Sequence, residues 1–224
     1  MSEIQVFWDK MHMENNIKFL TGSTGPKVWK QLNITNLIKK DKVVLNIGVG
    51  LGYCSFALKE KQVQLHCLDI SQVALDRVRK IAKVWLASEL NLLPSNTFDL
   101  AISYLVTQHI SDIDLKTQLV NVIRALKPEG IFAMQFAFDT NEKNKLSVYT
   151  NRNFQNGGVC RDLNYITKLV SEANGKIVWI SKPTLYLKQQ AGFYSIHIKK
   201  KDAQITHIQP IWIQKIKLRR QKHE

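Results

Sequence analysis

Short apolar runs alternate along the chain with segments in which apolar residues recur with helical periodicity. The short runs, rich in Val, Ile, Leu and Phe, predict strands at residues 43–47, 63–68, 84–87, 98–104, 131–138, 176–180 and 193–199. The helical periodicity predicts helices at residues 55–61, 71–81, 112–126 and 162–173. Such alternation is typical of a parallel sheet covered by helices on both faces. We therefore expect one α/β domain built on a doubly wound sheet of seven strands.

The part of the chain before the first predicted strand has helical character. Phe7 and Trp8 lie in one predicted helix, and Pro26 marks the first turn of a second helix. These two aromatic residues could also cover a ligand site, with His12 and Tyr149, although a stripe of core residues is the more common role. The pattern divides the chain into an N-terminal helical cap, a core and a basic C-terminal tail, at residues 1–36, 37–200 and 201–224.

Length and composition favour one soluble domain. The chain has 224 residues, of which 45% are hydrophobic, and this is enough for a single substantial core. It contains no apolar run of about 18 residues and no basic N-terminal segment followed by an apolar one, so we expect a cytoplasmic protein without a transmembrane segment. Cys54, Cys67 and Cys160 show no C-x-x-C spacing, so neither a disulfide framework nor a metal site is expected.

A formal net charge of +14 is the unusual property of the composition. Part of the excess lies in residues 199–224, and the rest is spread along the chain. A basic surface can bind nucleic acid, an anionic membrane or an acidic substrate, and it can also simply be solvated, which is the more common case. In the tail, apolar residues such as Trp212 alternate with basic ones without forming a clean helical stripe. This favours docking on the domain, or on a partner subunit of an oligomer, over membrane binding.

The most specific motif follows the first predicted strand. Gly48, Gly50 and Gly52 come directly after the apolar residues 43–47, and Asp69 follows the second predicted strand. Glycines at such a turn let the backbone approach a cofactor closely, and an acidic residue about 20 positions further on hydrogen-bonds the hydroxyls of a ribose. The dinucleotide fingerprint G-x-G-x-x-G requires glycine at position 53, where this chain has tyrosine. The motif thus indicates an adenosine-containing cofactor other than NAD or FAD.

The G-x-G-x-G spacing at residues 48–52 resembles motif I of class I S-adenosylmethionine-dependent methyltransferases. Taken alone, the glycines could serve a tight turn, and Asp69 could stabilise a helix N-terminus. Two further segments agree with the family, Phe-Asp-Leu at 98–100 and Leu-Lys-Pro-Glu-Gly at 126–130, and the resemblance extends over roughly residues 34–199. It implies a single Rossmann-like sheet of seven strands with the last strand antiparallel, S-adenosyl-L-methionine as the cofactor, and methyl transfer as the reaction.

The resemblance also assigns cofactor-binding roles. In the family, the glycine loop approaches the methionine part of the cofactor, the acidic residue after the second strand binds the ribose, and the following loops meet the adenine and the sulfonium. The corresponding residues here are Asn46, Gly48, Gly50, Gly52, Asp69, Ile70, Glu89, Leu90 and Tyr104. Asn46 departs from the family, which usually has Asp or Glu at this position. The departure removes a charge-assisted contact with the ammonium group of the cofactor, worth about 1 to 2 kcal/mol.

The acceptor side of the site is less clearly marked. His109 follows the fourth predicted strand, where the transferred methyl group is expected, and an imidazole there can act as general base for a hydroxyl acceptor. A loop histidine that packs against the next helix is an equally good interpretation. The candidate substrate-binding residues are Gln108, Gln135, Tyr149, Arg152 and Arg161. The arginines could bind a phosphate or carboxylate, although arginines on a loop are more often solvated.

Together these features predict an enzyme that transfers a methyl group from S-adenosyl-L-methionine to a hydroxyl or amine of a small acceptor. The positive charge favours an anionic or sugar-containing acceptor. An RNA methyltransferase is the main alternative, but the fourth strand ends in Ser-Tyr-Leu-Val rather than Asn/Asp-Pro-Pro-Tyr/Phe, and no Pro-Cys nucleophile is present. A non-catalytic binding protein on the same fold is a third interpretation, suggested by Asn46.

Overall fold

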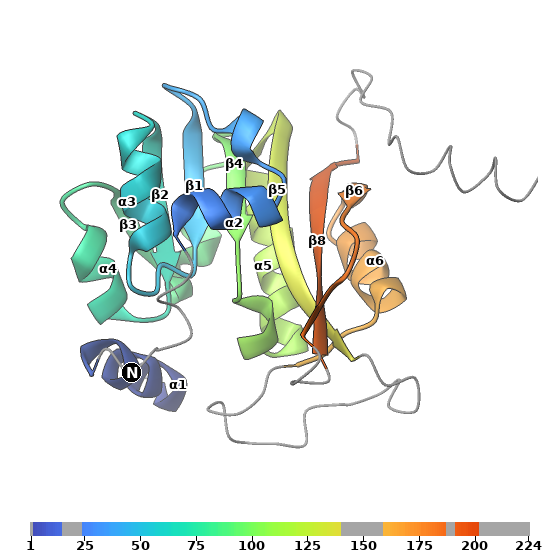
Figure 1. The fold of residues 1–224 in the computed structure, drawn as a ribbon, viewed down its shortest axis with the longest axis horizontal. Helices are drawn as coiled ribbons and strands as arrows, with labels where there is room; N and C mark the ends of the chain where they lie inside the picture. The colour runs from blue at the N-terminus through green and yellow to red at the C-terminus, as the bar shows by residue number, and fades with distance from the viewer. Residues whose placement is uncertain (1, 15–23, 140–158, 187–190, 202–224) are drawn as a thin grey trace, which may run out of the picture.

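The computed structural model describes residues 2–14, 24–139, 159–186 and 191–201 (Figure 1). Its centre is a mixed sheet with the strand order β3-β2-β1-β4-β5-β8-β6, in which β7 pairs with β8 beside this path. The strands are β1 (Val43–Ile47), β2 (Gln64–Asp69), β3 (Lys83–Leu86), β4 (Phe98–Ser103), β5 (Leu126–Asp139), β6 (Gly175–Ile180), β7 (Thr184–Tyr186) and β8 (Ala191–Lys200). The expected Rossmann-like α/β sheet is thereby confirmed.

The pairing directions separate the sheet into two parts. β1 lies between β2 and β4 and is parallel to both, β3 is parallel to β2, and β5 is parallel to β4. β8 is inserted between β5 and β6 and is antiparallel to both, so the last strand has the direction that the family resemblance implies. The parallel strands end at one common edge of the sheet, which is where ligands bind in open α/β sheets.

Among the differences from the prediction, two concern strands of the sheet. β5 begins at Leu126 rather than at residue 131, because Leu126 already pairs with Phe98 of β4. The register shifts before Ile131, and there Gly130 passes so close to β4 that an added Cβ would lie 2.5 Å from the carbonyl oxygen of Phe98. The short strand β7 was not expected, since three residues are too few to carry a recognisable alternation.

Helices cover both faces of the sheet (Figure 1). α2 (Gly25–Gln31), α3 (Tyr53–Glu60) and α4 (Gln72–Val78) pack on one face, while α5 (Asp112–Ala125) and α6 (Leu163–Glu172) pack on the other. Side chains of a strand alternate between the faces, so Val44 of β1 joins the first of these cores and Leu45 and Ile47 join the second.

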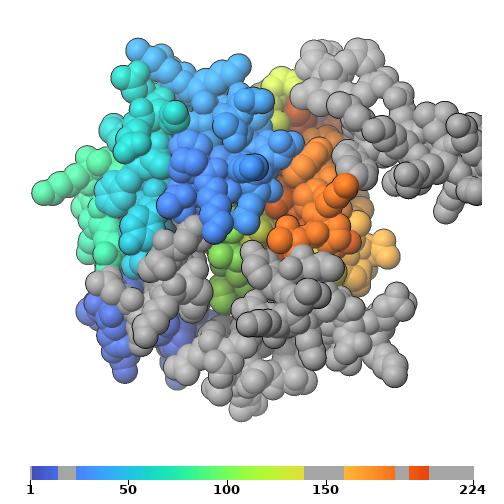
Figure 2. Space-filling view, in the orientation of Figure 1, coloured from blue at the N-terminus to red at the C-terminus, as the bar shows by residue number. Residues whose placement is uncertain are grey.

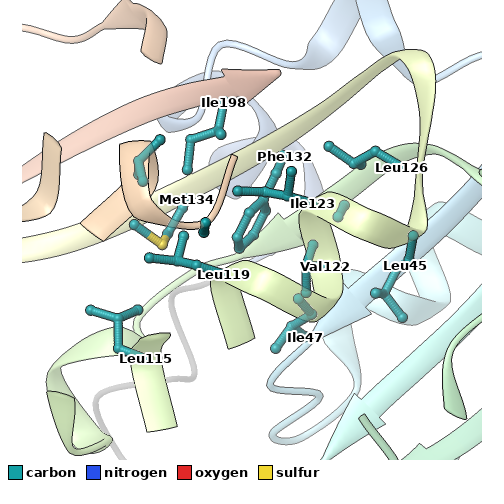
Figure 3. Packing of buried hydrophobic residues seen from close by; sticks show 14 of the residues in the cluster. Leu45, Ile47, Leu115, Leu119, Val122, Ile123, Leu126, Phe132, Met134 and Ile198 are labelled. Carbon is teal, nitrogen blue, oxygen red and sulfur yellow. The ribbon is translucent and has the colours of Figure 1, made fainter. Parts of the chain in front are cut away.

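The second core shows why α5 forms where it does. Apolar residues recur along one face of this helix and pack between β1 and β5, and Figure 3 shows Leu115, Leu119, Val122 and Ile123 directed toward the sheet. α4, α5 and α6 each begin at a capping side chain that accepts a hydrogen bond from the backbone N–H three residues further on. The three caps are Ser71, Ser111 and Asp162. They fix the start of each helix near the carboxyl edge of the parallel strands.

The two N-terminal helices are placed differently. α2 belongs to the core, because Trp29 and Leu32 are buried among residues of α3 and of the sheet, and Figure 2 shows this blue segment over the middle of the molecule. α1 (Glu3–Met13) lies instead at the carboxyl edge of the parallel strands, next to α4. Lys201 is the one residue of the predicted tail that the structure describes. None of the helices in the described part of the chain has the length and apolar character needed to cross a bilayer.

Candidate functional site

The glycine loop between β1 and α3 forms the centre of the site. Gly48, Gly50 and Gly52 have φ angles of 78°, 56° and 86°, in the left-handed region that glycine adopts without strain. Gly48 faces the loop after β4 so closely that an added Cβ would lie 2.2 Å from Val106 Cγ2. The loop therefore presents backbone without side chains at the carboxyl end of β1, as the close approach of a cofactor requires.

Asp69, at the end of β2, holds this loop in place. Its Oδ2 accepts hydrogen bonds from the backbone N–H groups of Val49 (2.6 Å) and Gly50 (3.3 Å), and its Oδ1 accepts one from Ser71 (2.9 Å). A carboxylate has about four acceptor positions, so one remains for a ribose hydroxyl. The predicted contact with both ribose hydroxyls would require release of the long bond from Gly50. Burial raises the pKa of the Asp69 carboxyl, and the backbone donors and His12 work in the opposite direction.

Asn46 is directed into the fold. Its Nδ2 donates a hydrogen bond to Ser55 Oγ of α3 at 2.9 Å, and the residue is 3% exposed. Ser55 Oγ in turn lies 3.4 Å from Cys67 Sγ of β2, a thiol whose pKa burial raises to about 12 and which is therefore uncharged. The amide of Asn46 thus links β1 to α3 behind the glycine loop, and its contact with the cofactor stays a prediction.

The other predicted cofactor residues lie on the loops around the glycine loop. Glu89 Oε2 accepts a hydrogen bond at 2.8 Å from the backbone N–H of the last β3 residue and so caps the short helix η3 (Ala87–Leu92), in which Leu90 is buried. Ile70 is half-buried directly after β2. Tyr104, directly after β4, donates a hydrogen bond from its hydroxyl to Gln31 Oε1 of α2. The structure brings these residues to one edge of the sheet, and their roles toward the cofactor remain predictions.

α1 is attached to the same edge. Asp9 Oδ1 accepts hydrogen bonds from Ser71 Oγ (2.6 Å) and from the backbone N–H of Val73 (3.2 Å), which ties α1 to the start of α4. Arg77 of α4 adds a second link by donating to the backbone carbonyl of His12 at 2.8 Å. Asp9 is absent from the predicted site, because an acidic residue on an amphipathic helix has the same sequence pattern whether it is solvated or buried.

Trp8 connects α1 to the acceptor side. Its ring centroid lies 5.9 Å from that of His12 and 5.2 Å from that of His109, which it meets edge-on. His12 is 3% exposed, and burial lowers the pKa of its imidazole, although the carboxylate of Asp69 raises it in opposition. The three rings form a wall that extends from the neighbourhood of Asp69 to the loop after β4. Trp8 and His12 thus lie at the edge that carries the glycine loop, and the lid formed with Phe7 and Tyr149 stays a prediction.

His109 ends the short helix η4 (Thr107–His109), which follows β4. Burial lowers the pKa of its imidazole from 6.5 to about 4, so the ring is neutral at pH 7. Within the described part of the chain its Nδ1 has no hydrogen-bond partner, and the same holds for His12 Nδ1, Ser103 Oγ, Gln108 Oε1 and Gln135 Oε1. Buried polar atoms are rarely left unpaired, so these atoms at the carboxyl edge are candidates for hydrogen bonds with a ligand.

Arg161 makes its hydrogen bonds to other parts of the protein. Its guanidinium donates hydrogen bonds to Asp112 Oδ1 (2.7 Å) and to the backbone carbonyls of Thr107 (2.7 Å) and Ile110 (2.8 Å), and the residue is 4% exposed. The sequence leaves two interpretations of Arg161, an arginine that binds a phosphate or carboxylate of the substrate and, more commonly, a solvated one. The structure instead shows a clamp across η4, because three donor groups of Arg161 already have acceptors in the protein.

The remaining predicted substrate residues fall into two groups. Gln108 and Gln135 are buried, and Thr107 Oγ1 donates to the backbone carbonyl of Gln135 at 2.8 Å, which fixes η4 against β5. Tyr149 and Arg152 lie outside the described residues. Gln108 and His109 thus lie in η4, which Thr107 joins to the backbone of β5 at Gln135.

The charges of the described residues are divided between the two edges of the sheet. Thirteen Lys and Arg residues and four Asp and Glu residues lie in the segments at the amino ends of the parallel strands, which are 39–42, 59–61, 80–83, 95–99, 124–129, 174–176 and 199–201. Eight Asp and Glu residues and three Lys and Arg residues lie in the segments at the carboxyl ends, which are 2–14, 69–70, 86–90, 103–114, 160–162 and 180–184. Among the described residues, acidic side chains therefore predominate at the edge that holds the candidate site.

Comparisons with known proteins agree with the architecture. A family model described as a methyltransferase domain matches residues 44–130. A similar solved structure is 1,6-didemethyltoxoflavin-N1-methyltransferase from Burkholderia thailandensis with bound 1,6-didemethyltoxoflavin and S-adenosylhomocysteine. It has a TM-score of 0.65 and 15% identity over 89% of this chain and 88% of that chain.

Two further structures show how widely the fold is used. Phosphoethanolamine N-methyltransferase 2 from Haemonchus contortus, in complex with phosphomonomethylethanolamine and S-adenosylhomocysteine, has a TM-score of 0.62 and 18% identity over 89% of this chain and 60% of that chain. The cyclase SpnF has a TM-score of 0.61 and 14% identity over 75% of this chain and 81% of that chain. A search of curated protein sequences finds no match. At these identities the structural likeness speaks for the fold, and the acceptor must be argued from the site.

Proposed function

Because this chain is a class I S-adenosylmethionine-dependent methyltransferase, we propose that its acceptor is a small molecule that is methylated on nitrogen. The observation that carries this proposal is a pair of acceptor atoms, Gln108 Oε1 in η4 and Gln135 Oε1 in the adjoining β5, that have no hydrogen-bond partner among the described residues, together with the neutral ring of His109 in η4. Such atoms accept hydrogen bonds from the N–H groups of an amine or a nitrogen heterocycle.

The residues at the edge of the sheet fit the cofactor. When bound, S-adenosyl-L-methionine supplies a methyl group on a positively charged sulfur. The bare backbone of the glycine loop suits its methionine part, Asp69 keeps one acceptor position for a ribose hydroxyl, and Glu89 and Leu90 are the candidates for the adenine. The buried atoms at the same edge that have no partner within the described segments are polar groups available to this cofactor and its acceptor.

The chemistry also favours nitrogen over oxygen. An amine in its neutral form attacks the methyl carbon with its own lone pair while the carbon–sulfur bond breaks, and its proton can leave to water afterwards. A hydroxyl needs a base that takes the proton as the new bond forms, and a base works best when its pKa lies near the working pH. Since burial lowers the pKa of His109 to about 4, this ring is a weak base. His109, Gln108 and Gln135 are therefore assigned to orienting the acceptor nitrogen, and alignment supplies most of the rate.

Charge supports the same choice. The sequence favours an anionic acceptor on the basis of the net charge of +14, but in the described part of the chain the positive excess lies at the edge away from the site. An acidic edge attracts an amine, which is cationic in solution, and repels an anion. The bound amine must first release one proton to water, which frees the lone pair that attacks the methyl carbon. The names of two similar structures, both N-methyltransferases, agree with a nitrogen acceptor.

The test is methyl transfer from labelled S-adenosyl-L-methionine to a panel of small amines, nitrogen heterocycles, alcohols, carboxylates and RNA. We expect label in nitrogen compounds. Gln135→Leu should lower kcat/KM for the acceptor about tenfold, the effect of one lost hydrogen bond of about 1.4 kcal/mol, while calorimetry shows unchanged affinity for S-adenosylhomocysteine. Label confined to alcohols or carboxylates would overturn the nitrogen assignment. Label confined to RNA would establish the main alternative instead.

A further inference from the structure

We propose that the edge of the sheet opposite the methyl-transfer site binds the phosphate backbone of a nucleic acid duplex. This basic edge consists of the segments at the amino ends of the parallel strands, with thirteen Lys and Arg residues and four Asp and Glu residues: 39–42, 59–61, 80–83, 95–99, 124–129, 174–176 and 199–201. The proposal does not depend on the identity of the methyl acceptor, because the two sites lie at opposite edges of the sheet.

The basic side chains form a row across the sheet rather than a local cluster. Every strand along the sheet path except β4 has a lysine within three residues of its end at this edge. These lysines are Lys83 at β3, Lys61 before β2, Lys42 before β1, Lys127 at β5, Lys200 at β8 and Lys176 at β6. Neighbouring strands lie about 4.8 Å apart, so the row extends over roughly 29 Å from β3 to β6. A duplex carries one phosphate charge per about 1.7 Å of its axis, so a row of this length can meet several phosphates at once.

Most of the positive charge on this edge is available to a partner. In the described residues of the edge, the ion pairs are Lys42 with Asp99 (2.8 Å), Lys127 with Asp99 (2.7 Å) and Lys199 with Glu129 (2.6 Å). Asp99 lies between two lysines and can neutralise no more than one charge. Further lysines of the connecting segments are exposed to solvent, namely Lys39, Lys40, Lys59, Lys61 and Lys80.

The composition of the edge distinguishes a phosphate backbone from a membrane surface. Proteins that lie on a bilayer combine basic residues with large apolar side chains that enter the interface. In the described part of the chain, the exposed large hydrophobic residues all lie outside the segments of the basic edge: Val6, Met13, Tyr53, Phe56, Leu92, Ile113 and Val120. Phosphate contacts of a duplex are made by basic and polar groups, need no apolar side chains, and carry no sequence information directly.

The experiment compares two variants of the full chain with the same change in net charge. The edge variant carries Lys39→Glu, Lys40→Glu and Lys61→Glu, and the control variant carries Lys27→Glu, Lys30→Glu and Lys168→Glu on the helices α2 and α6. All six lysines are exposed, so both variants should fold, and thermal melting checks this. Binding of a labelled DNA duplex of about 20 base pairs is followed by fluorescence anisotropy between about 50 and 200 mM salt.

We expect the affinity of the edge variant for the duplex to fall at least tenfold. The plot of log binding constant against log salt concentration should become shallower by about 2 to 3, since each phosphate contact contributes about 0.9 to its slope. The control variant should change the affinity for the duplex less than about threefold. Its substituted side chains lie away from the contact, and salt largely screens their interaction with the phosphates. Equal losses in both variants would show that net charge alone attracts DNA and would overturn the proposal. So would binding of the parent chain to vesicles rich in phosphatidylserine, or to polyglutamate, with no binding to the duplex.

Discussion

The carboxyl and amino edges of this sheet both carry many charged residues, but they use them differently. At the carboxyl edge Asp69 accepts three backbone hydrogen bonds, and Arg161 donates to three acceptors while only 4% exposed. At the basic edge the lysines are mostly exposed, and their ion pairs involve partly solvated side chains. Removing one partner of a buried charged network costs several kcal/mol, whereas an exposed ion pair contributes about 0 to 1 kcal/mol. Charge at the first edge therefore positions backbone, and charge at the second edge is available to solvent and partners.

Among substitutions that test this difference between the edges, one at Asp69 should have the largest effect on stability. Asp69→Ala leaves the buried backbone N–H groups of Val49, Gly50 and Ser71 without their acceptor, so we expect the free energy of unfolding to fall by about 4 kcal/mol. Binding of S-adenosylhomocysteine should weaken at least tenfold. Urea unfolding and calorimetry measure the two effects. As a control, Asp69→Asn keeps one acceptor oxygen and should lose less stability; equal stability of the Ala variant and the parent would contradict the assigned role.

Arg161 should give the next largest effect. Arg161→Met removes the guanidinium from the carbonyls of Thr107 and Ile110 and should cost about 3 kcal/mol of stability. Because these carbonyls flank the segment that carries Gln108 and His109, we also expect the turnover number to fall at least tenfold with little change in cofactor affinity. The control is Asp112→Asn, which keeps both carbonyl contacts. If the two variants lose the same turnover, the clamp on the carbonyls is not what positions η4.

His109 gives a pH effect of intermediate size. Its folded pKa of about 4 lies below the ordinary value of 6.5, so the unfolded chain binds more protons between these values. The contribution of His109 to the free energy of unfolding is complete above pH 6.5 and is lost as the pH falls toward 4. At pH 5 the loss amounts to about 2 kcal/mol. His109→Gln should flatten that part of the stability profile in urea unfolding. His12, His66 and His197, whose pKa values burial also lowers, will maintain some slope in the variant.

The smallest effect on stability is expected at the basic edge, where a small loss would support the difference between the two edges of the sheet. Lys39→Glu with Lys40→Glu should change the free energy of unfolding by less than about 0.5 kcal/mol, since both side chains are exposed. Methyl transfer should also be unchanged, because these residues lie at the end of the sheet away from the glycine loop. Urea unfolding and a methyl-transfer assay measure both quantities. A loss comparable to that of Arg161→Met would show that the basic edge is part of the structural network after all.

The parts of this molecule that periodicity determines could be predicted from the sequence. Apolar runs locate β1, β2 and β4 to within a residue or so, and the glycines after β1 and Asp69 after β2 mark the site because both positions are set by short-range backbone geometry. Side-chain partners could not be predicted in the same way. Arg161 in a polar stretch has the pattern of a solvated residue, and only the tertiary fold brings it to η4.

The same limit applies to α1 and to Asn46. The sequence indicates a helix near Trp8, but the attachment of Asp9 to the start of α4 joins residues more than 60 positions apart. For Asn46, the family resemblance fixes the position in the strand and says nothing of Ser55, which accepts its hydrogen bond. Contacts of this kind depend on which helix covers which face, and local pattern does not encode that choice.

The tie between Asp69 and the glycine loop has a consequence for the thermodynamics of cofactor binding. A loop with three glycines has much conformational freedom in a flexible state, and fixing the backbone of each residue opposes binding by about 1 to 2 kcal/mol if it must occur when the ligand arrives. Here the N–H groups of Val49 and Gly50 are already held by the carboxylate, so that ordering accompanies folding. Cofactor association should therefore show a small entropic penalty. In Asp69→Ala, a more unfavourable binding entropy should accompany the enthalpy that is lost with the ribose hydrogen bond.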